Sequence, residues 1–383
     1  MEENFLALDF GSGHISAVLT VYDDNTGTCR VRHATRVTCP SVSACYILDF
    51  DRTVRALSQL LTEMQEYAKF DPTIVVGLRG DFLSFRRSGG FQPINPKQRF
   101  VTDKDVRAAL DNSIPENLNT DLEVVDLLPQ SFTLDGKTGI QNPVGLEATC
   151  LESETFLSCG LRTHLNNLNR VMTAVGYEDF EAVPTVLALC GSLLKPEEKQ
   201  AGVLLLDIGS QNSSAALYHK GMLEAAWEIP LGAEIGLQEV ADVLQNELDQ
   251  TRKLIAQYTY GDDEIMDDLL DEAACKLLKK IHKELVQSLS YVKYPPHRVV
   301  LTGGGAETYV KNAVTTVLGA RRVRLANHEN LIADREDMLA PAYTSALSLV
   351  LHSQRHGGNL RAGKNARSKS GFLNNLLAKF GLN

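Results

Sequence analysis

The sequence predicts an α/β fold built from two similar halves that face each other across a cleft, and three observations carry this prediction. First, the segments 6–19 and 204–217, which lie 198 positions apart, carry identical residues at eight of fourteen positions. Second, an apolar strand-like run at 298–302 enters a glycine-rich turn and is followed by a helical pattern. Third, 44% hydrophobic and 22% charged residues are typical of globular domains, and 383 residues are enough for two to three of them.

The repeated segment is a strand that ends in an aspartate, followed by a glycine turn and a second strand. Asp9 holds this position in the first copy and Asp207 in the second. Two unrelated β-hairpins with similar turns are the alternative explanation. The number of identical positions favours duplication, and opposed hairpins would place the two carboxylates on either side of a shared cleft.

The three glycine turns suggest a site for a nucleoside triphosphate. Glycine lets backbone N–H groups approach phosphate oxygens without interference from a Cβ atom, and a carboxylate can hold a hydrated Mg²⁺ ion. The predicted nucleotide-binding residues are Asp9, Gly11, Ser12, Gly13, His14, Asp207, Gly209, Ser210, Gln211, Asn212, Gly303, Gly304, Gly305 and Ala306. Among them Asp9 and Asp207 are the predicted Mg²⁺ ligands. The alternatives are capped turn carboxylates for the aspartates and a tight strand–helix turn for 303–305.

Residues 78–160 differ from both halves and keep apolar residues throughout, which indicates an inserted α+β subdomain rather than a linker. The three glycine segments, in their order, resemble the actin, sugar-kinase and chaperone ATPase superfamily. Within the insertion, Asp-Leu-Leu-Pro-Gln-Ser-Phe-Thr-Leu-Asp at 126–135 and Gly-Ile-Gln-Asn-Pro-Val-Gly-Leu at 139–146 resemble the 1C signature of the FtsA family of bacterial cell-division proteins. The resemblance covers essentially the whole chain.

This resemblance implies an actin-like, ribonuclease-H-like duplicated fold and a function in cell division. It implies ATP binding with at most weak ATPase activity, filament formation through the 1C subdomain, and tethering of the FtsZ ring, through the FtsZ C-terminal tail, to the cytoplasmic side of the bacterial membrane at the division site. Later divisome proteins would be recruited there. The implied divisions are 1A at 1–77 and 161–197, 1C at 78–160, 2A at 198–240, a reduced 2B at 241–297, a return through 2A and 1A at 298–351, a linker at 352–370 and a membrane-targeting helix at 371–383.

The sequence departs from the family at the phosphate turns. His14 stands where the family has lysine, and a neutral imidazole attracts a γ-phosphate less than an ammonium does. The second turn, 207–214, lacks two glycines, a hydroxyl and a carboxylate of the family pattern, so side chains at 210 and 211 would crowd a phosphate. No clean match to the adenosine-side Glu-x-x-Lys helix occurs near 249–255. The 2B region, where the resemblance implies that FtsZ tails dock, is shorter here than is usual in the family.

Charge is divided unevenly along the chain. Six of the 38 basic residues and none of the 48 acidic residues follow position 337, so the tail carries +6 and the body −16. An acidic body disfavours nucleic-acid binding, whereas a basic tail suits an anionic phospholipid surface. After a flexible linker, apolar residues recur with helical spacing, and a core or partner-docking helix is the alternative to a membrane helix. The predicted membrane-binding residues are Phe372, Leu373, Leu376, Leu377, Lys379 and Phe380.

Other classes of protein fit less well. Seven cysteines in an odd count, without a C-x-x-C pair, favour a reducing compartment over disulfides or zinc. No apolar run approaches the length of a membrane span, and the acidic start at 1–4 does not resemble a secretory leader. Three alternatives to a membrane tether stay open: a nucleotide-free scaffold of the same fold, a pilus-assembly platform of the PilM type, and a small-molecule kinase.

Overall fold

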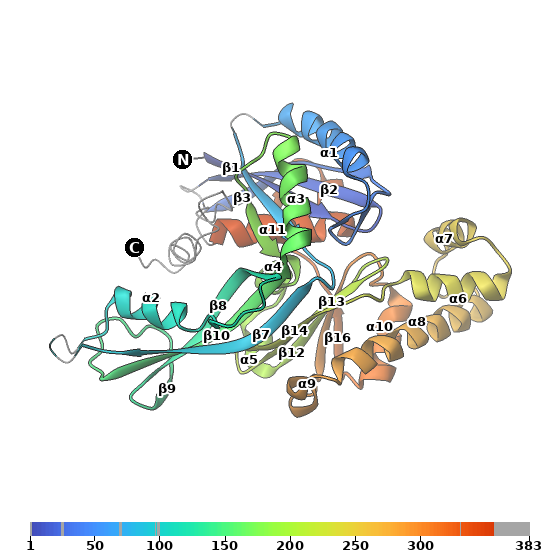
Figure 1. The fold of residues 1–383 in the computed structure, drawn as a ribbon. Helices are drawn as coiled ribbons and strands as arrows, with labels where there is room; N and C mark the ends of the chain where they lie inside the picture. Colours follow the sequence, from blue (N-terminus) through green and yellow to red (C-terminus); the bar gives the residue numbers. More distant parts are fainter. Residues whose placement is uncertain are drawn as a thin grey trace.

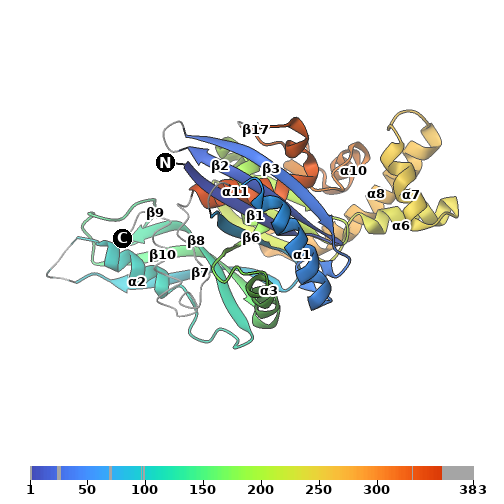
Figure 2. The same cartoon turned by 90° about the horizontal axis from the view of Figure 1, so that it is seen from above.

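The computed structural model describes residues 2–23, 27–68, 71–95, 97, 100–329 and 331–355. The predicted membrane-targeting helix, with Phe372, Leu373, Leu376, Leu377, Lys379 and Phe380, lies outside these residues, as does most of the predicted linker. In Figure 1 two α/β halves lie one above the other, and a smaller β-rich subdomain projects from one side. Helices α6 (Glu234–Leu244), α7 (Leu248–Gln257) and α8 (Glu264–Leu285) project from the opposite side, an arrangement that Figure 2 also shows from above.

The first half contains a mixed sheet with helices on both faces. Its strand order is β11-β6-β1-β2-β3-β17. These strands are Glu181–Pro184 (β11), Thr73–Leu78 (β6), Glu2–Phe10 (β1), His14–Asp23 (β2), Thr28–Thr38 (β3) and Ile332–Ala333 (β17), with a small hairpin of Val42–Ser43 (β4) and Tyr46–Ile47 (β5) beside them. The helices are Phe50–Gln65 (α1), Arg162–Ala174 (α3), Thr185–Leu193 (α4) and Thr344–Arg355 (α11).

The second half repeats this plan. Its sheet has the order β14-β13-β12-β15-β16. These strands are Met222–Ile229 (β14), Ser213–His219 (β13), Val203–Ile208 (β12), Arg298–Thr302 (β15) and Arg322–Leu325 (β16). The helices are Pro196–Ala201 (α5), Glu234–Leu244 (α6), Leu248–Gln257 (α7), Glu264–Leu285 (α8), Leu289–Lys293 (α9) and Thr308–Leu318 (α10).

The strand pairings confirm the duplication. Strand β1 lies between antiparallel β2 and parallel β6, and β12 lies in the same way between antiparallel β13 and parallel β15. Asp9 is opposite Ser16, and Asp207 is opposite Ser214. The central strands are buried from Asn4 to Phe10 and from Val203 to Ile208 because helices cover both faces of each sheet, which explains why most of these residues are apolar.

The inserted subdomain has its own sheet and core. Its sheet has the order β7-β10-β8-β9, made by Leu83–Pro93 (β7), Cys150–Leu161 (β10), Leu122–Leu134 (β8) and Lys137–Ile140 (β9). Helix α2 (Asp103–Asp111) covers it. The helix approaches β7 so closely that a Cβ on Gly90 would lie 1.8 Å from the Ala109 carbonyl oxygen. Only glycine fits there, so the glycine pair at 89–90 permits this packing.

The insertion is fastened to the second half by polar contacts. The Gln130 side-chain oxygen accepts a hydrogen bond from the Leu223 backbone N–H at 2.8 Å. Arg87 forms ion pairs with Glu154 in the insertion and with Glu224 on β14, the latter at 2.5 Å. The Pro-Gln motif therefore lies at the junction between the insertion and the second half.

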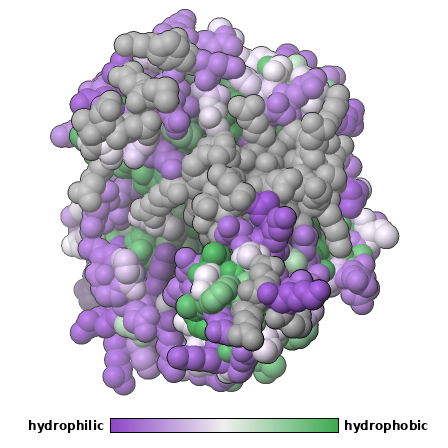
Figure 3. Space-filling view, turned by 90° about the vertical axis from the view of Figure 1, so that its left-hand side faces the viewer, coloured by the Kyte–Doolittle hydropathy of each residue, from purple (hydrophilic) through white to green (hydrophobic). Residues whose placement is uncertain are grey.

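Figure 3 views the molecule from the side that carries the insertion. Among the residues coloured by hydropathy in this view, hydrophilic ones predominate, and a cluster of hydrophobic residues lies in the lower part. The exposed large apolar side chains of the insertion are Phe91, Phe100 and Leu146. All seven cysteines are free thiols, and no helix among the described residues is long and apolar enough to cross a membrane.

Candidate functional site

A cavity of about 660 Å³ lies between the two halves, where the three glycine turns meet. It brings together most of the residues predicted from the sequence. Those that line it are Asp9, Gly11, Ser12, His14, Asp207, Gly209, Ser210, Asn212, Gly303, Gly304 and Gly305. Gly13, Gln211 and Ala306 belong to the same turns without lining the cavity.

The first turn is covered by its own histidine. The His14 Nδ1 atom donates to the Ser12 carbonyl at 2.9 Å, and the ring lies so close to Gly11 that a Cβ there would be 2.4 Å from His14 Nε2. Burial, reinforced by repulsion from Arg36, lowers the pKa of His14 to about 4. The imidazole is therefore neutral at pH 7 and occupies the space beside the Gly11 backbone.

Backbone donors of the first turn are engaged within the protein. The Gly11 N–H donates to the His14 carbonyl at 3.0 Å, and the Gly13 N–H donates to the Val42 carbonyl at 2.8 Å. Neither group points freely at a ligand, so the first turn offers less to a phosphate than its sequence suggests.

The second turn is more open to a ligand. Asn212 is buried and lines the cavity, and its Nδ2 group has no hydrogen-bond partner among the described residues. An unpaired amide donor that lines the cavity can bind an anionic oxygen. Beside it, the Gln211 side-chain oxygen accepts from the Ser43 hydroxyl at 2.7 Å, a contact that joins the two halves across the cleft.

The third turn closes tightly against the second. Gly303 has φ of +94°, and a Cβ there would lie 2.3 Å from the Ile208 carbonyl oxygen. The Gly305 N–H donates to that same carbonyl at 2.9 Å. A Cβ on Gly304, in contrast, would meet nothing within 4 Å, so this residue faces open space in the cavity.

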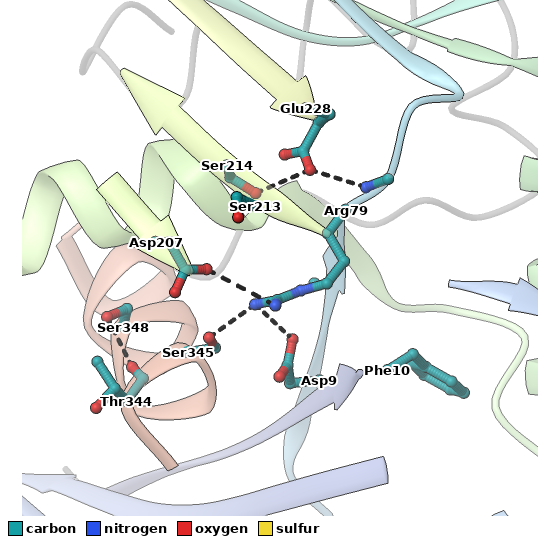
Figure 4. Close-up of polar contacts among 12 residues, drawn as sticks. Asp9, Phe10, Arg79, Asp207, Ser213, Ser214, Glu228, Thr344, Ser345 and Ser348 are labelled. Atoms are coloured by element: carbon teal, nitrogen blue, oxygen red, sulfur yellow. Dashed lines mark hydrogen bonds and ion pairs between the residues drawn. The ribbon is translucent and has the colours of Figure 1, made fainter. Parts of the chain in front are cut away.

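Arg79, which the sequence analysis did not single out, lies between the two aspartates of the repeat. It follows β6, and its guanidinium is 3.2 Å from Asp9 Oδ1 and 3.7 Å from Asp207 Oδ2 (Figure 4). The same group donates to the Ser345 hydroxyl of α11 at 2.7 Å. Burial alone would lower the pKa of Arg79, but the surrounding carboxylates outweigh it and raise the pKa, so the guanidinium stays charged. One feature of the sequence could have pointed to Arg79: it is a charged residue directly after an apolar, strand-like run.

A divalent cation between Asp9 and Asp207 does not fit this arrangement, because the guanidinium fills the space between the carboxylates. Among the described residues no group of three or more His, Cys, Asp or Glu side chains is placed to hold a metal ion. The two aspartates meet across the cleft as the sequence predicts, but the partner they share is a side chain.

Glu228 completes the polar cluster on the far side of Arg79. Its Oε2 atom accepts from the Gly80 N–H at 2.9 Å and from the Ser214 hydroxyl at 2.8 Å. Burial raises the pKa of Glu228 to about 8, so the carboxyl is largely protonated at pH 7. Asp9 and Asp207 then supply the negative charge that faces Arg79.

The other end of the cavity is largely apolar. Small and aliphatic side chains of α6 and α8 line it, with Gly236 packed against Ala273 so that a Cβ there would be 3.6 Å from the Ala273 carbonyl oxygen. At the margin of this apolar end, Arg252 of α7 forms an ion pair with Glu234 at 3.1 Å. The aromatic rings of Tyr260 and Tyr309 stack at this end with centroids 6.4 Å apart. Such an apolar slot suits a flat base better than it suits phosphates.

Comparisons with known proteins agree with this architecture. A family model described as the SHS2 domain inserted in FTSA matches residues 83–158, which lie within the inserted subdomain. Cell division protein FtsA of Enterococcus hirae is 23% identical over 372 residues, covering 91% of this chain and 83% of that protein. A solved structure titled PilM-PilN type IV pilus biogenesis complex has a TM-score of 0.62 at 17% identity, covering 91% of this chain and 97% of that one. MreB5 of Spiroplasma citri bound to ADP has a TM-score of 0.52 at 9% identity, covering 93% and 98%.

The duplicated halves, the cleft between them and these structural likenesses define an actin-like protein with an SHS2 insertion. The resemblance to FtsA drawn from the sequence is confirmed by the relatives that match most of the chain at 22–24% identity. The chain is thus similar to the cell-division protein FtsA over about nine-tenths of its length, at low sequence identity.

Proposed function

We propose that this chain is an FtsA-like actin homologue that assembles on the cytoplasmic membrane, tethers the FtsZ ring and recruits divisome proteins at the division site. The observation that carries this proposal is the SHS2 insertion at 83–158, matched by the model of the domain inserted in FtsA, within a chain that resembles FtsA over nine-tenths of its length. The likeness to PilM concerns the fold alone at 17% identity, so it does not favour a role in pilus assembly. The division into subdomains 1A, 1C, 2A and 2B is part of this proposal.

Self-assembly through the insertion accounts for its exposed apolar surface. Phe91, Phe100 and Leu146 are each more than two-fifths exposed, which is costly for large apolar side chains unless a partner covers them. A neighbouring subunit in a homopolymer is the partner that the resemblance implies.

Membrane attachment rests on the tail sequence. Fully burying a large apolar side chain is worth about 1.5–3 kcal/mol, and an interfacial helix immerses only part of that area. Basic residues add about 1 kcal/mol each at an anionic leaflet, whereas ordering the helix costs about 1–2 kcal/mol per residue. A single tail would bind weakly and reversibly, and polymerisation would strengthen attachment through avidity.

A vesicle co-sedimentation experiment tests both the anchor and the FtsZ partner. The full chain is mixed with phosphatidylglycerol-containing vesicles and a labelled FtsZ C-terminal peptide. The wild type should pellet with the peptide, and Leu376→Glu/Leu377→Glu should stay in the supernatant while still binding the peptide. The matched control Asn374→Glu/Asn375→Glu adds the same charge off the apolar spacing and should pellet. A wild type that fails to pellet contradicts the membrane role, and pelleting without peptide contradicts the FtsZ role.

ATP is the ligand we propose for the cleft, with the base in the apolar end and any hydrolysis weak. The donor Asn212 Nδ2 and the open space at Gly304 leave room for phosphates beside the second and third turns. In isothermal titration the wild type should bind ATP, and Gly304→Val should bind at least tenfold more weakly with an unchanged Tm. Absent binding at millimolar ATP would favour the second candidate, a nucleotide-free scaffold, which the crowding by His14 and Arg79 supports.

A further inference from the structure

We infer that Arg79 takes the place of a divalent metal in this cleft, and that its guanidinium holds the two halves together without nucleotide or metal. A divalent cation therefore does not bind between Asp9 and Asp207, although two opposed aspartates would lead one to expect it. This inference concerns the protein's own residues and does not rest on the proposed binding of ATP.

The geometry supports a bridging role. Asp9 lies at the end of β1 in the first half, Asp207 near the end of β12 in the second, and Ser345 on α11. One guanidinium contacts all three, at 3.2 Å, 3.7 Å and 2.7 Å (Figure 4). A single buried side chain thus links the two hairpins and a third element, which is the arrangement a bound cation would otherwise provide.

Burial strengthens this link. Arg79, Asp9 and Asp207 are each less than one-tenth exposed, so water screens their charges little. The other titratable groups nearby are Glu228, on the far side of Arg79, whose carboxyl is largely protonated at pH 7, and Arg36, whose charge interacts with that of Asp9. The fixed positive charge of the guanidinium also repels a divalent cation from the same space.

A second link spans the same interface. The Ser43 hydroxyl of the first half donates to Gln211 of the second at 2.7 Å, and the Gly80 N–H, next to Arg79, donates to Glu228 on β14 at 2.9 Å. These contacts need no ligand. Closure of the cleft in this protein is therefore a property of its own side chains.

Electron paramagnetic resonance with Mn²⁺ as the probe tests whether Arg79 excludes metal. The full-length wild type and Asp207→Asn should bind Mn²⁺ to the same extent. Arg79→Ala should gain about one site per chain, since two carboxylates are then free to ligate it, and Arg79→Ala/Asp207→Asn should lose that gain. Arg79→Lys keeps a positive charge between the carboxylates and should bind as little Mn²⁺ as the wild type. This variant tests whether the charge excludes the metal if Arg79→Ala fails to fold.

Two results would overturn the inference. One is a wild type that binds more Mn²⁺ than Asp207→Asn does, because metal and arginine would then share the site. The other is a folded Arg79→Ala that gains no Mn²⁺. Titration with ATP separates this question from the proposed function: the affinity should agree within about twofold between EDTA and Mg²⁺, and a tenfold gain in Mg²⁺ overturns the inference. Loss of all ATP binding contradicts only the proposed ligand, because the Mn²⁺ results stand independently.

Discussion

The two halves place different residues at equivalent positions beside their aspartates. Asp9 is opposite Gly77 of parallel strand β6, and Asp207 is opposite Thr302 of parallel strand β15. Two residues further along, the first half has Arg79 and the second has Gly304. The same backbone position thus carries a buried cation in one half and open space in the other.

This difference explains why the two sides of the cleft are unequal where the glycine turns meet. The first half supplies side chains that fill the cavity, namely Arg79 and the neutral ring of His14. The second half supplies glycines and the unpartnered amide of Asn212. Duplication of a fold fixes where strands end, whereas the residues placed there decide whether a ligand finds room.

Removing the buried cation should have the largest effect on this comparison. Arg79→Ala leaves Asp9 and Asp207 facing each other without a partner, which should lower the free energy of unfolding by about 3–5 kcal/mol. Urea unfolding at pH 7 measures this change. Arg55→Ala, at an exposed position of α1, should change it by less than about 0.5 kcal/mol. A similar small loss for both variants would mean that the first half does not depend on its cation.

The glycines of the second half should differ sharply among themselves. Gly303→Ala forces a Cβ into the left-handed φ region and against the Ile208 carbonyl, which should cost about 1–3 kcal/mol. Gly304→Ala meets open space and should leave stability within about 0.5 kcal/mol of the wild type. Thermal unfolding of the two variants, side by side, measures the contrast. Equal losses of stability in the two variants would contradict the view that the backbone conformation requires glycine at 303 but not at 304.

Glu228, between the halves, should make stability depend on pH. Its pKa is raised from 4.5 to about 8, so the folded state holds a proton that the unfolded state releases. Stability from this group is fully present below pH 4.5 and is lost as pH rises to about 8. The loss should be about 1.4 kcal/mol for each pH unit between these two pKa values. Glu228→Gln should remove this dependence and be more stable than the wild type at pH 8.

Urea unfolding between pH 4.5 and 8 checks this expectation for Glu228, with Glu116→Gln as an exposed control. A Glu228→Gln variant whose stability falls with pH as steeply as the wild type would show that the carboxyl is already ionised in the folded protein.

The contact between Ser43 and Gln211 should have the smallest effect. Both residues join the halves at the exposed edge of the cleft, so losing their hydrogen bond should cost about 0.5–1 kcal/mol. A double-mutant cycle of Ser43→Ala and Gln211→Ala measures the coupling. Strictly additive losses would show that this bond does not hold the halves together.

Much of the fold followed from sequence pattern. The repeat around Asp9 and Asp207 predicted the duplicated hairpins, since a strand, turn and strand are defined by local alternation and glycine. Persistent apolar residues at 78–160 predicted an insertion, and the family match lies within it. Most predicted cleft residues line the cavity because the ends of equivalent strands meet at the interface between the halves.

Arg79 could not be assigned a role in this way. Its partners are 70, 128 and 266 positions away in the sequence, at Asp9, Asp207 and Ser345, and no spacing rule connects them. The position of the His14 ring against Gly11 could likewise not be predicted from the sequence, because the orientation of a turn side chain depends on the burial and charge that surround it.

The duplicated α/β plan, the insertion and the position of the cleft can be predicted from the amino-acid sequence, because these depend on periodicity and on glycine within short segments. What fills the cleft depends on long-range packing. A charge that follows β6, aspartates from β1 and β12 and a hydroxyl from α11 meet only after both sheets have folded and packed against each other, and the energy of buried charges depends on that meeting.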